Sequence, residues 1–178
     1  MDTNILDVHG QPISLEWALE FGGYFMADGC LFISRHSRAD NPYGWSFQPQ
    51  ARIGQRIDSL PLLRAIQAKL GGYIRQYTGK HRSRNGRVYQ CNPTAVWTTS
   101  SQEEAERVIS LLELLQLPHR KTAQVQVMRE FLEIRRRARQ RGPNPNGALT
   151  GIRYTQEEYD RMYECYRKLR MLKQYRGG

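Results

Sequence analysis

The stretch SLEWALEFGGYFMADG, residues 14–29, decides how this chain folds. Ser14 is a favourable N-cap, so we expect a helix that begins there and runs to about Ala27. Gly29 suits the left-handed conformation that follows many helices. The residues after it, 30–36, are typical of a short strand. The sequence therefore predicts a helix that leads directly into a strand.

The expected helix is apolar around nearly its whole circumference, whereas most helices of a small domain have one apolar face. Aromatic residues form one stripe and small or aliphatic residues form the other. Two glycines inside a helix cost about 1 kcal/mol each relative to alanine. Close packing against another helix offsets such a cost. We therefore expect a second copy of the chain on this stripe, with a central helix packed inside its own domain as the alternative. The expected dimer interface comprises Leu19, Gly22, Gly23, Met26 and Ala27.

Asp28 is the most informative single residue of this helix. A carboxylate at a helix C-terminus faces the negative end of the helix dipole, and a bound divalent cation removes that conflict. Two helices paired about a twofold axis would bring two such carboxylates together in an oxygen-rich site suited to Mg²⁺. An ordinary Asp-Gly turn is the alternative.

The remaining pattern predicts an α+β domain. Strands are expected at 30–36, 46–57, 73–78 and 88–99, separated by a turn at 39–45, a helix at 60–70 and a basic loop at 79–87. Further helices are expected behind a capping box (Ser100 with Glu103, or Ser101 with Glu104), from about 121 to 141, and after Thr155. This αββαββα order predicts a four-stranded antiparallel sheet with additional C-terminal helices.

The chain is expected to divide at a segment rich in Pro, Asn and Gly. We predict a core at 1–141, a linker at 142–154 and a C-terminal helical appendage at 155–178. Three scattered cysteines predict reduced, buried thiols in an intracellular compartment, without zinc. No apolar run reaches membrane-spanning length, and the first residues do not resemble a secretory signal.

The net charge of +10 over 178 residues, carried mostly by arginine, favours a polyanionic partner. Alternation along the second expected strand places polar side chains on one face and apolar ones on the other. Gln and Arg can form paired hydrogen bonds with adenine and guanine in the major groove, although a merely solvated face is the alternative. The expected contacts to double-stranded DNA are Ser34, His36, Arg38, Ser46, Gln48, Gln50, Arg52, Arg75, Tyr77, Lys80, Arg82, Arg84, Arg87 and Gln90. The cluster 135–141 is equally consistent with a solvated helix end.

The segment FGGYFMADG, residues 21–29, followed by CLF, resembles the LAGLIDADG motif of homing endonucleases. The small pair, the Ala-Asp-Gly end and the following strand all match. Met26 replaces the first acidic position, which does not bind metal in the family. Together with the αββαββα order, the resemblance covers roughly residues 14–140.

The resemblance implies a function and a site. It implies hydrolysis of both strands of a long DNA site by a homodimer, since the chain has one motif. The metal would be Mg²⁺, with Mn²⁺ or Ca²⁺ as substitutes, held at Asp28 and Gly29. A strand of about nine residues is close to one turn of DNA in length, so two subunits would cover about two turns of a pseudo-palindromic site.

The resemblance also implies two further active-site residues. Gln55 fits the polar position at the end of the second strand. The basic position falls within His119-Arg120-Lys121, where Lys121 is favoured and His119 stays open because Leu117-Pro118 shifts the spacing. Arg56 could supply an additional cation. An RNA-splicing maturase, a non-cutting DNA-binding protein and a basic interaction domain without metal chemistry are the competing functions.

Overall fold

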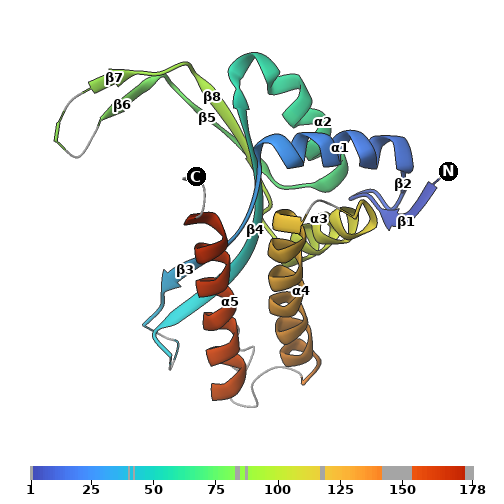
Figure 1. Ribbon diagram of the computed structural model, residues 1–178, viewed down its shortest axis with the longest axis vertical. Coiled ribbons are helices and arrows are strands. Elements are labelled where there is room, and N and C mark those ends of the chain that lie inside the picture. The colour runs from blue at the N-terminus through green and yellow to red at the C-terminus, as the bar shows by residue number, and fades with distance from the viewer. Residues whose placement is uncertain are drawn as a thin grey trace. The chain divides into compact units, whose positions relative to one another are not determined.

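The computed structural model describes residues 2–39, 41, 43–82, 85–86, 88–116, 119–141 and 154–174. The chain forms two compact units, and their borders cut across two strands of one sheet. The first unit comprises Met1–Cys30 and Ala51–Leu115, and the second comprises Leu31–Gln50 and Gln116–Gly178. Figure 1 labels the helices and strands of both units.

Each unit combines strands with helices. The first unit contains β1 (Asp2–Leu6), β2 (Pro12–Ser14), α1 (Leu15–Asp28), η1 (Ile57–Ser59), α2 (Leu60–Leu70), β5 (Tyr73–Tyr77), β6 (Lys80–Arg82), β7 (Val88–Gln90), β8 (Thr94–Thr98) and α3 (Gln102–Leu114). The second unit contains α4 (His119–Gln140) and α5 (Gln156–Gln174). Strands β3 (Gly29–Ser37) and β4 (Trp45–Arg56) contribute to both units.

The main sheet has four antiparallel strands in the order β3-β4-β8-β5, which confirms the predicted α+β class. Arg52 of β4 lies opposite Thr98 of β8, and Arg56 lies opposite Thr94. On the other side of β8, Tyr73 of β5 lies opposite Thr98. This register fixes which side chains share a face of the sheet.

Helix α1 begins as its sequence predicts, and it ends differently. The Ser14 hydroxyl accepts a hydrogen bond from the backbone N–H of Trp17 at 3.3 Å. Gly29 has an extended backbone, with φ −78° and ψ 147°, and the expected left-handed conformation is wrong. Any Cβ at this position would collide with the ring and carbonyl oxygen of Phe25. Glycine is therefore needed here for space, which lets β3 start at once.

The basic segment after β5 also differs from its expected loop. Lys80 pairs with Gln90 and Arg82 with Val88, so β6 and β7 form a separate two-stranded sheet. In Figure 1 this hairpin extends from β5 and β8, away from the helices of the first unit. The expected fourth strand is consequently interrupted between β7 and β8. The short β1–β2 pair at the N-terminus was not expected.

The core of the first unit forms where the aromatic stripe of α1 meets the sheet. Phe21 and Phe25 are buried, and Phe21 packs edge-on against Trp97 of β8 with ring centroids 6.4 Å apart. The Trp97 indole N–H donates to the carbonyl oxygen of Gly71 at 2.7 Å. The apolar faces of α2 and α3 complete this core with Leu63, Ile66, Leu70, Ala105, Val108, Ile109, Leu111 and Leu112.

Glu104 ties the start of β5 to the start of α3. Of the two expected capping boxes, the structure contains Ser101 with Glu104. The Glu104 carboxylate also accepts the backbone N–H of Gly72 at 2.9 Å and the hydroxyl of Ser100 at 2.9 Å. The Glu104 carboxylate therefore fixes the position of the start of β5.

In the second unit, α4 and α5 lie side by side (Figure 1). Met162, Cys165 and Leu169 of α5 are buried, as are Met128, Phe131 and Leu132 of α4. Burial raises the pKa of the Cys165 thiol to about 12. None of the three cysteines forms a disulfide, but Cys91 is exposed, so the expectation of buried thiols fails there. Among the described residues, no helix combines the length and apolar content that a bilayer crossing requires.

Candidate active site and DNA-binding face

Asp28 and Gln55 meet at the C-terminal end of α1. Gln55 lies opposite Ala95 in the register, on the same sheet face as the buried Ile53. This is the face on which α1 packs, so Gln55 reaches the last residue of the helix. Its Nε2 donates to Asp28 Oδ2 at 2.7 Å. The structure therefore brings together two residues that the sequence predicted for one site.

The chemistry of this pair suits a hard cation. Asp28 is exposed, and no basic residue lies in the last turn of α1. Within the described residues, Asp28 Oδ1 and Gln55 Oε1 are oxygen acceptors with no hydrogen-bond partner. Mg²⁺ usually binds through one or two carboxylates together with water and phosphate oxygens. The oxygen acceptors of these two residues fit such a metal.

One described chain nevertheless supplies only part of a metal site. Its described residues contain no group of three or more His, Cys, Asp or Glu side chains that could hold a metal ion. Gly29 is buried, and its backbone N–H donates to the carbonyl oxygen of Phe25. Its expected role at the metal stays a prediction.

The small-residue stripe of α1 splits into an inward and an outward part. Gly22 is buried, and a Cβ there would collide with the side chain of Leu115. Its expected place on a partner-facing surface is therefore wrong, because the chain itself covers it. Gly23 and Ala27 are exposed, and Leu19 is 59% exposed. A Cβ on Gly23 would meet nothing within 4 Å, so nothing in the described chain explains this glycine.

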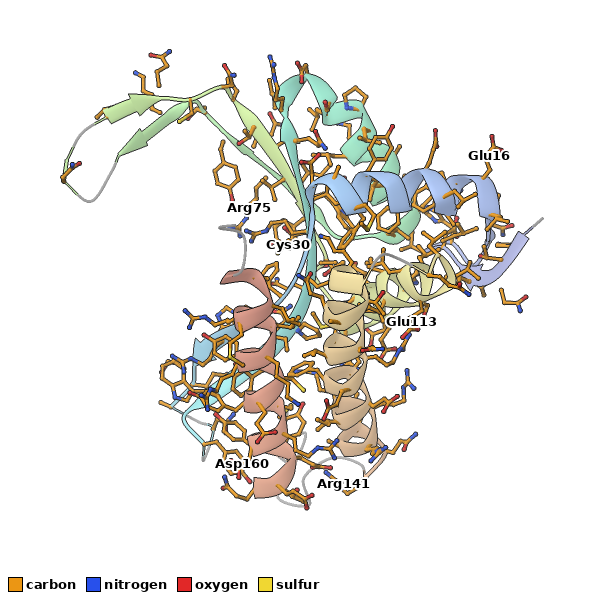
Figure 2. All side chains as sticks on the ribbon, viewed as in Figure 1. Glu16, Cys30, Arg75, Glu113, Arg141 and Asp160 are labelled. Atoms are coloured by element: carbon orange, nitrogen blue, oxygen red, sulfur yellow. The ribbon has the colours of Figure 1, made fainter. Side chains whose placement is uncertain are left out.

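The outward face of the sheet carries the expected polar residues in the first unit. In the register of the sheet, Thr98 lies between Arg52 of β4 and Tyr73 of β5. One row further along, Val96 lies between Gly54 and Arg75. Arg52 is exposed, and Arg75 projects from β5 into solvent (Figure 2). Tyr77, 49% exposed, lies on the same face.

The same alternation continues in the second unit. Ser34 and His36 share one face of β3, with the hydroxyl of Ser34 3.0 Å from His36 Nε2. Phe47 and Pro49 of β4 are buried, whereas Ser46, Gln48 and Gln50 between them are only half-buried. Arg38 lies exposed just beyond β3. The predicted contacts within β3 and the first half of β4 thus lie on the polar face of their strands.

Thr94 and Val96 of β8 were missed. They fall in the middle of these rows, opposite Arg56 and Gly54. On the expected fourth strand, the sequence indicated only Gln90 as a DNA contact, and that residue precedes the interruption. The size and apolar character of Trp97 marks the inward face, and counting outward from it finds both residues.

Several other predicted residues lie apart from this face or outside the described residues. Lys80 and Gln90 are exposed partners in the β6–β7 hairpin. Arg84 and Arg87 lie outside the described residues, and only the backbone of Arg82, His119 and Arg120 is described. Lys121 is half-buried in the first turn of α4, in the second unit, and its role stays a prediction. Arg56 pairs with Asp58 at 3.5 Å, so that guanidinium is already engaged.

Comparison with solved structures identifies the fold. The chain is 15% identical to the homing endonuclease I-TnaI over 87% of this chain and 94% of the other, with a TM-score of 0.61. It is 21% identical to the archaeal intron-encoded homing endonuclease I-Vdi141I complexed with DNA, over 92% and 89% of the two chains, with a TM-score of 0.62. It is 16% identical to I-SmaMI bound to an uncleaved DNA target with calcium ions, over 84% of this chain but 42% of that one, with a TM-score of 0.59.

Comparison with protein families is decisive for the identity. No curated protein matches the sequence. The family profile described as LAGLIDADG endonuclease matches residues 21–132, more than half of the chain, and its match begins at the motif that ends in Asp28 and Gly29. This chain therefore belongs to the LAGLIDADG endonuclease family.

Proposed function

We propose that this chain is a homing endonuclease that cuts both strands of a long, pseudo-palindromic DNA site by Mg²⁺-dependent phosphodiester hydrolysis. The observation that carries the proposal is the exposed Asp28 carboxylate, held by Gln55 at the end of α1, in a member of this family. A binder without chemistry has no need for a carboxylate at the negative end of a helix.

The chain's own residues would divide the work. Asp28 from each of two chains would hold the metal ions. When bound, Mg²⁺ supplies an activated water and charge stabilisation at the leaving oxygen. Gln55 fixes the rotamer of Asp28 through the 2.7 Å hydrogen bond and offers Oε1 to a water hydrogen. Lys121 would provide a cation near the developing negative charge. Mn²⁺ or Ca²⁺ could occupy the same oxygen ligands.

A homodimer completes this site. Gly23 is a mid-helix glycine without a packing role in the described chain, and it lies on an exposed stripe with Leu19 and Ala27. A second α1 in close contact would explain its retention despite the helix cost of about 1 kcal/mol. The chain covers 94% of I-TnaI but only 42% of I-SmaMI. This relation is expected if two copies of this chain together correspond to one larger protein such as I-SmaMI.

The sheet face is the proposed DNA-binding surface. Its outward side combines Arg, Gln and Tyr side chains, and the chain carries a net charge of +10. Strand β3 has 9 residues and therefore spans about 30 Å, close to one helical turn of DNA. Two such sheets related by a twofold axis would read two half-sites in opposite orientation.

Selection from a library of randomised DNA duplexes tests the proposed activity. The protein is incubated with the library and Mg²⁺, and the cut ends are sequenced. We expect related half-sites in inverted orientation around one cut position. Specific binding without cutting, in Mg²⁺ or Mn²⁺, would instead support a DNA-binding regulator. Promotion of intron RNA splicing without DNA cutting would support a maturase.

The variant Gly23→Leu tests the dimer separately. Leucine at this position has open space in one chain but would separate two closely packed helices. We expect a folded monomer that no longer cuts DNA, measured by analytical ultracentrifugation and the cleavage assay. Ala68→Leu, at an exposed position of α2, is the matched control and should remain dimeric and active. A Gly23→Leu protein that stays dimeric and cuts normally would reject pairing through this stripe.

A further inference from the structure

The outer half of the β3–β4 hairpin has limited support within the sheet. The pairing of β4 with β8 begins at Arg52. In the described part of the chain, β3 is therefore the only neighbouring strand of Trp45–Gln50. An isolated pair of strands is marginally stable in water. This half nevertheless carries predicted base-reading residues, among them Ser34, His36 and Gln48. Something outside the sheet must hold it in shape.

Helix α5 packs tyrosine rings against the inner face of this hairpin. Phe47 of β4 is only 4% exposed. Its ring centroid lies 5.4 Å from that of Tyr159, 6.3 Å from Tyr163 and 5.9 Å from Tyr166. Aromatic pairs at such distances contribute beyond their buried area. The α5 helix therefore supplies the apolar layer that the sheet lacks at this end.

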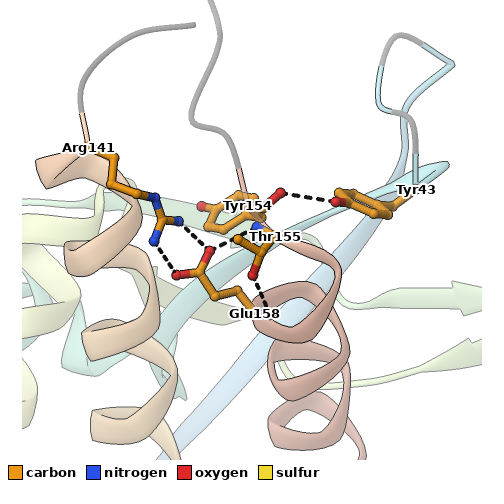
Figure 3. A network of polar contacts seen from close by, with 5 residues as sticks. All are labelled: Tyr43, Arg141, Tyr154, Thr155 and Glu158. Atoms are coloured by element: carbon orange, nitrogen blue, oxygen red, sulfur yellow. Dashed lines mark hydrogen bonds and ion pairs between the residues drawn. The ribbon is translucent and has the colours of Figure 1, made fainter.

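Directional contacts fix the turn end of the hairpin as well. Tyr43 and Tyr159 stack with ring centroids 4.3 Å apart. The Tyr43 hydroxyl donates to the carbonyl oxygen of Tyr154 at 3.0 Å (Figure 3). In return, the Tyr159 hydroxyl donates to the carbonyl oxygen of Tyr43 at 3.3 Å. These two hydrogen bonds link Tyr43, just before β4, to the residues at the start of α5.

Arg35 links the two strands to the same helix. Its guanidinium lies 4.1 Å from the ring centroid of Trp45 and 5.5 Å from that of Tyr166. Cation–π contacts of this kind are directional and favour arginine. Arg135 of α4 donates to the carbonyl oxygen of Phe47, which connects the start of β4 to α4 as well.

The brace is itself secured to α4. The Arg141 guanidinium pairs with both carboxylate oxygens of Glu158 (Figure 3). Arg161 pairs with Glu130 at 3.1 Å. Glu158 also accepts the backbone N–H of Thr155, so the first turn of α5 is capped and tied to the end of α4 at once. Because these contacts hold α5 against α4, α5 can in turn hold the hairpin in place.

We propose that α5 is a specificity-determining brace, with Tyr159 as its main positioning residue: it holds the outer half of the β3–β4 hairpin in the geometry needed to read the base pairs that Ser34, His36 and Gln48 face. This inference rests on the proposed DNA function. It concerns a helix outside residues 21–132, the range matched to the family. Tyr159 acts through the hairpin, so its loss affects base discrimination before it affects chemistry.

The first measurement needs no DNA. Hydrogen exchange of the full-length protein is compared for Tyr159→Ala and Tyr159→Phe. Phenylalanine keeps the 4.3 Å ring stack and loses one hydrogen bond, whereas alanine loses both. We expect exchange about tenfold faster in Tyr159→Ala at 32–48. The β5 and β8 strands should be unchanged, and Tyr159→Phe should stay near wild type. Should Tyr159→Ala fail to fold, Tyr159→Leu keeps apolar volume without the ring. Unchanged exchange at 32–48 in a folded variant would overturn the brace.

The second measurement scores base discrimination. Cleavage is measured on DNA targets that are substituted one base pair at a time. The variants His36→Ala and Arg75→Ala identify the base pairs that are read from β3 and from β5. Tyr159→Ala should lose about tenfold discrimination at the pairs that His36 reads and keep it at those that Arg75 reads. The cleavage rate of Tyr159→Ala at saturating DNA should stay near that of the wild type. A uniform loss over all pairs would contradict the inference. A wild-type protein that recognises no DNA would refute the proposed function, and the exchange result would still report the brace.

Discussion

In the β3–β4 hairpin of the second unit, tyrosine rings of α5 cover the inner face, and Phe47 beneath them is only 4% exposed. The β5–β8 pair of the first unit continues instead into the β6–β7 hairpin, where Lys80, Val88 and Gln90 are all exposed. Both hairpins carry residues predicted to contact DNA. The first hairpin is therefore shaped by contacts with its own chain before any ligand arrives, whereas the described side chains of β6 and β7 are exposed to solvent.

This difference bears on how each hairpin would contribute to recognition. Base readout needs side chains held in a defined geometry, whereas contacts to phosphates tolerate more adjustment because they are dominated by charge. A braced hairpin suits the first task and an exposed, basic hairpin suits the second. Substitutions in each hairpin measure this difference in support.

The largest effect is expected from a matched pair of substitutions in the two hairpins. Phe47→Ala removes a buried ring from the braced hairpin and should lower the free energy of unfolding by about 3–5 kcal/mol. Val88→Ala, at a position that is 64% exposed, should change it by less than about 0.5 kcal/mol. Urea denaturation measures both. Equal losses would show that the two hairpins are supported alike.

The next largest effect on stability is expected from Glu104, whose carboxylate holds the start of β5. Glu104→Ala leaves the backbone N–H groups of Gly72, Ser100 and Ser101 without their acceptor. We expect a loss of about 1–3 kcal/mol in the free energy of unfolding, as for buried or half-buried donors left unsatisfied. A loss below this range would mean that water replaces the carboxylate at little cost.

The same carboxylate predicts a dependence on pH. Burial alone would raise the pKa of Glu104, but hydrogen bonds from Ser100, Gly72 and Ser101 hold that pKa below its usual value of 4.5. Its stabilising contribution is therefore complete above pH 4.5 and is lost as the pH falls through the lowered value. Glu104→Gln should remove this part of the acid sensitivity. Identical acid profiles of the variant and the wild type would contradict the assignment.

The smallest effect is expected at the pair that fixes α5 to α4. Glu158→Gln removes the charge that faces Arg141, whose side chain is 45% exposed. Because solvent screens such pairs, the loss should stay below about 1 kcal/mol and shrink further in high salt. Thermal denaturation at two salt concentrations tests it. A larger, salt-independent loss would assign the pair a role beyond an exposed contact.

Much of the fold was predictable because it depends on local signals. Ser14, Ser101 and Thr155 cap helices through short side chains, and each cap begins its helix where the sequence indicates. Alternation along β4 correctly separated the buried Phe47 from Gln48. Helix α2 begins differently: Ser59 makes no side-chain cap, because the short helix η1 precedes α2.

The rest depended on contacts that sequence alone does not specify. Gly22 and Gly23 are adjacent and chemically identical, yet only Gly22 packs on Leu115, a residue more than 90 positions later. The brace was likewise hidden, because the tyrosines of α5 and the ring of Phe47 are distant in the chain and meet only in the folded second unit. Asp28 and Gln55 could be paired beforehand only through the family resemblance.

Cleavage by Asp28→Asn tests whether the Asp28 carboxylate holds the catalytic metal. The variant keeps the size of the side chain and its hydrogen bond partner but removes the charge that would hold the metal. Using the site recovered from the library, with Mg²⁺, we predict DNA binding as tight as that of the wild type and no cleavage of either strand. Asp58→Asn, an exposed aspartate in η1, should cut normally. An Asp28→Asn protein that cuts the site at the wild-type rate would contradict the account.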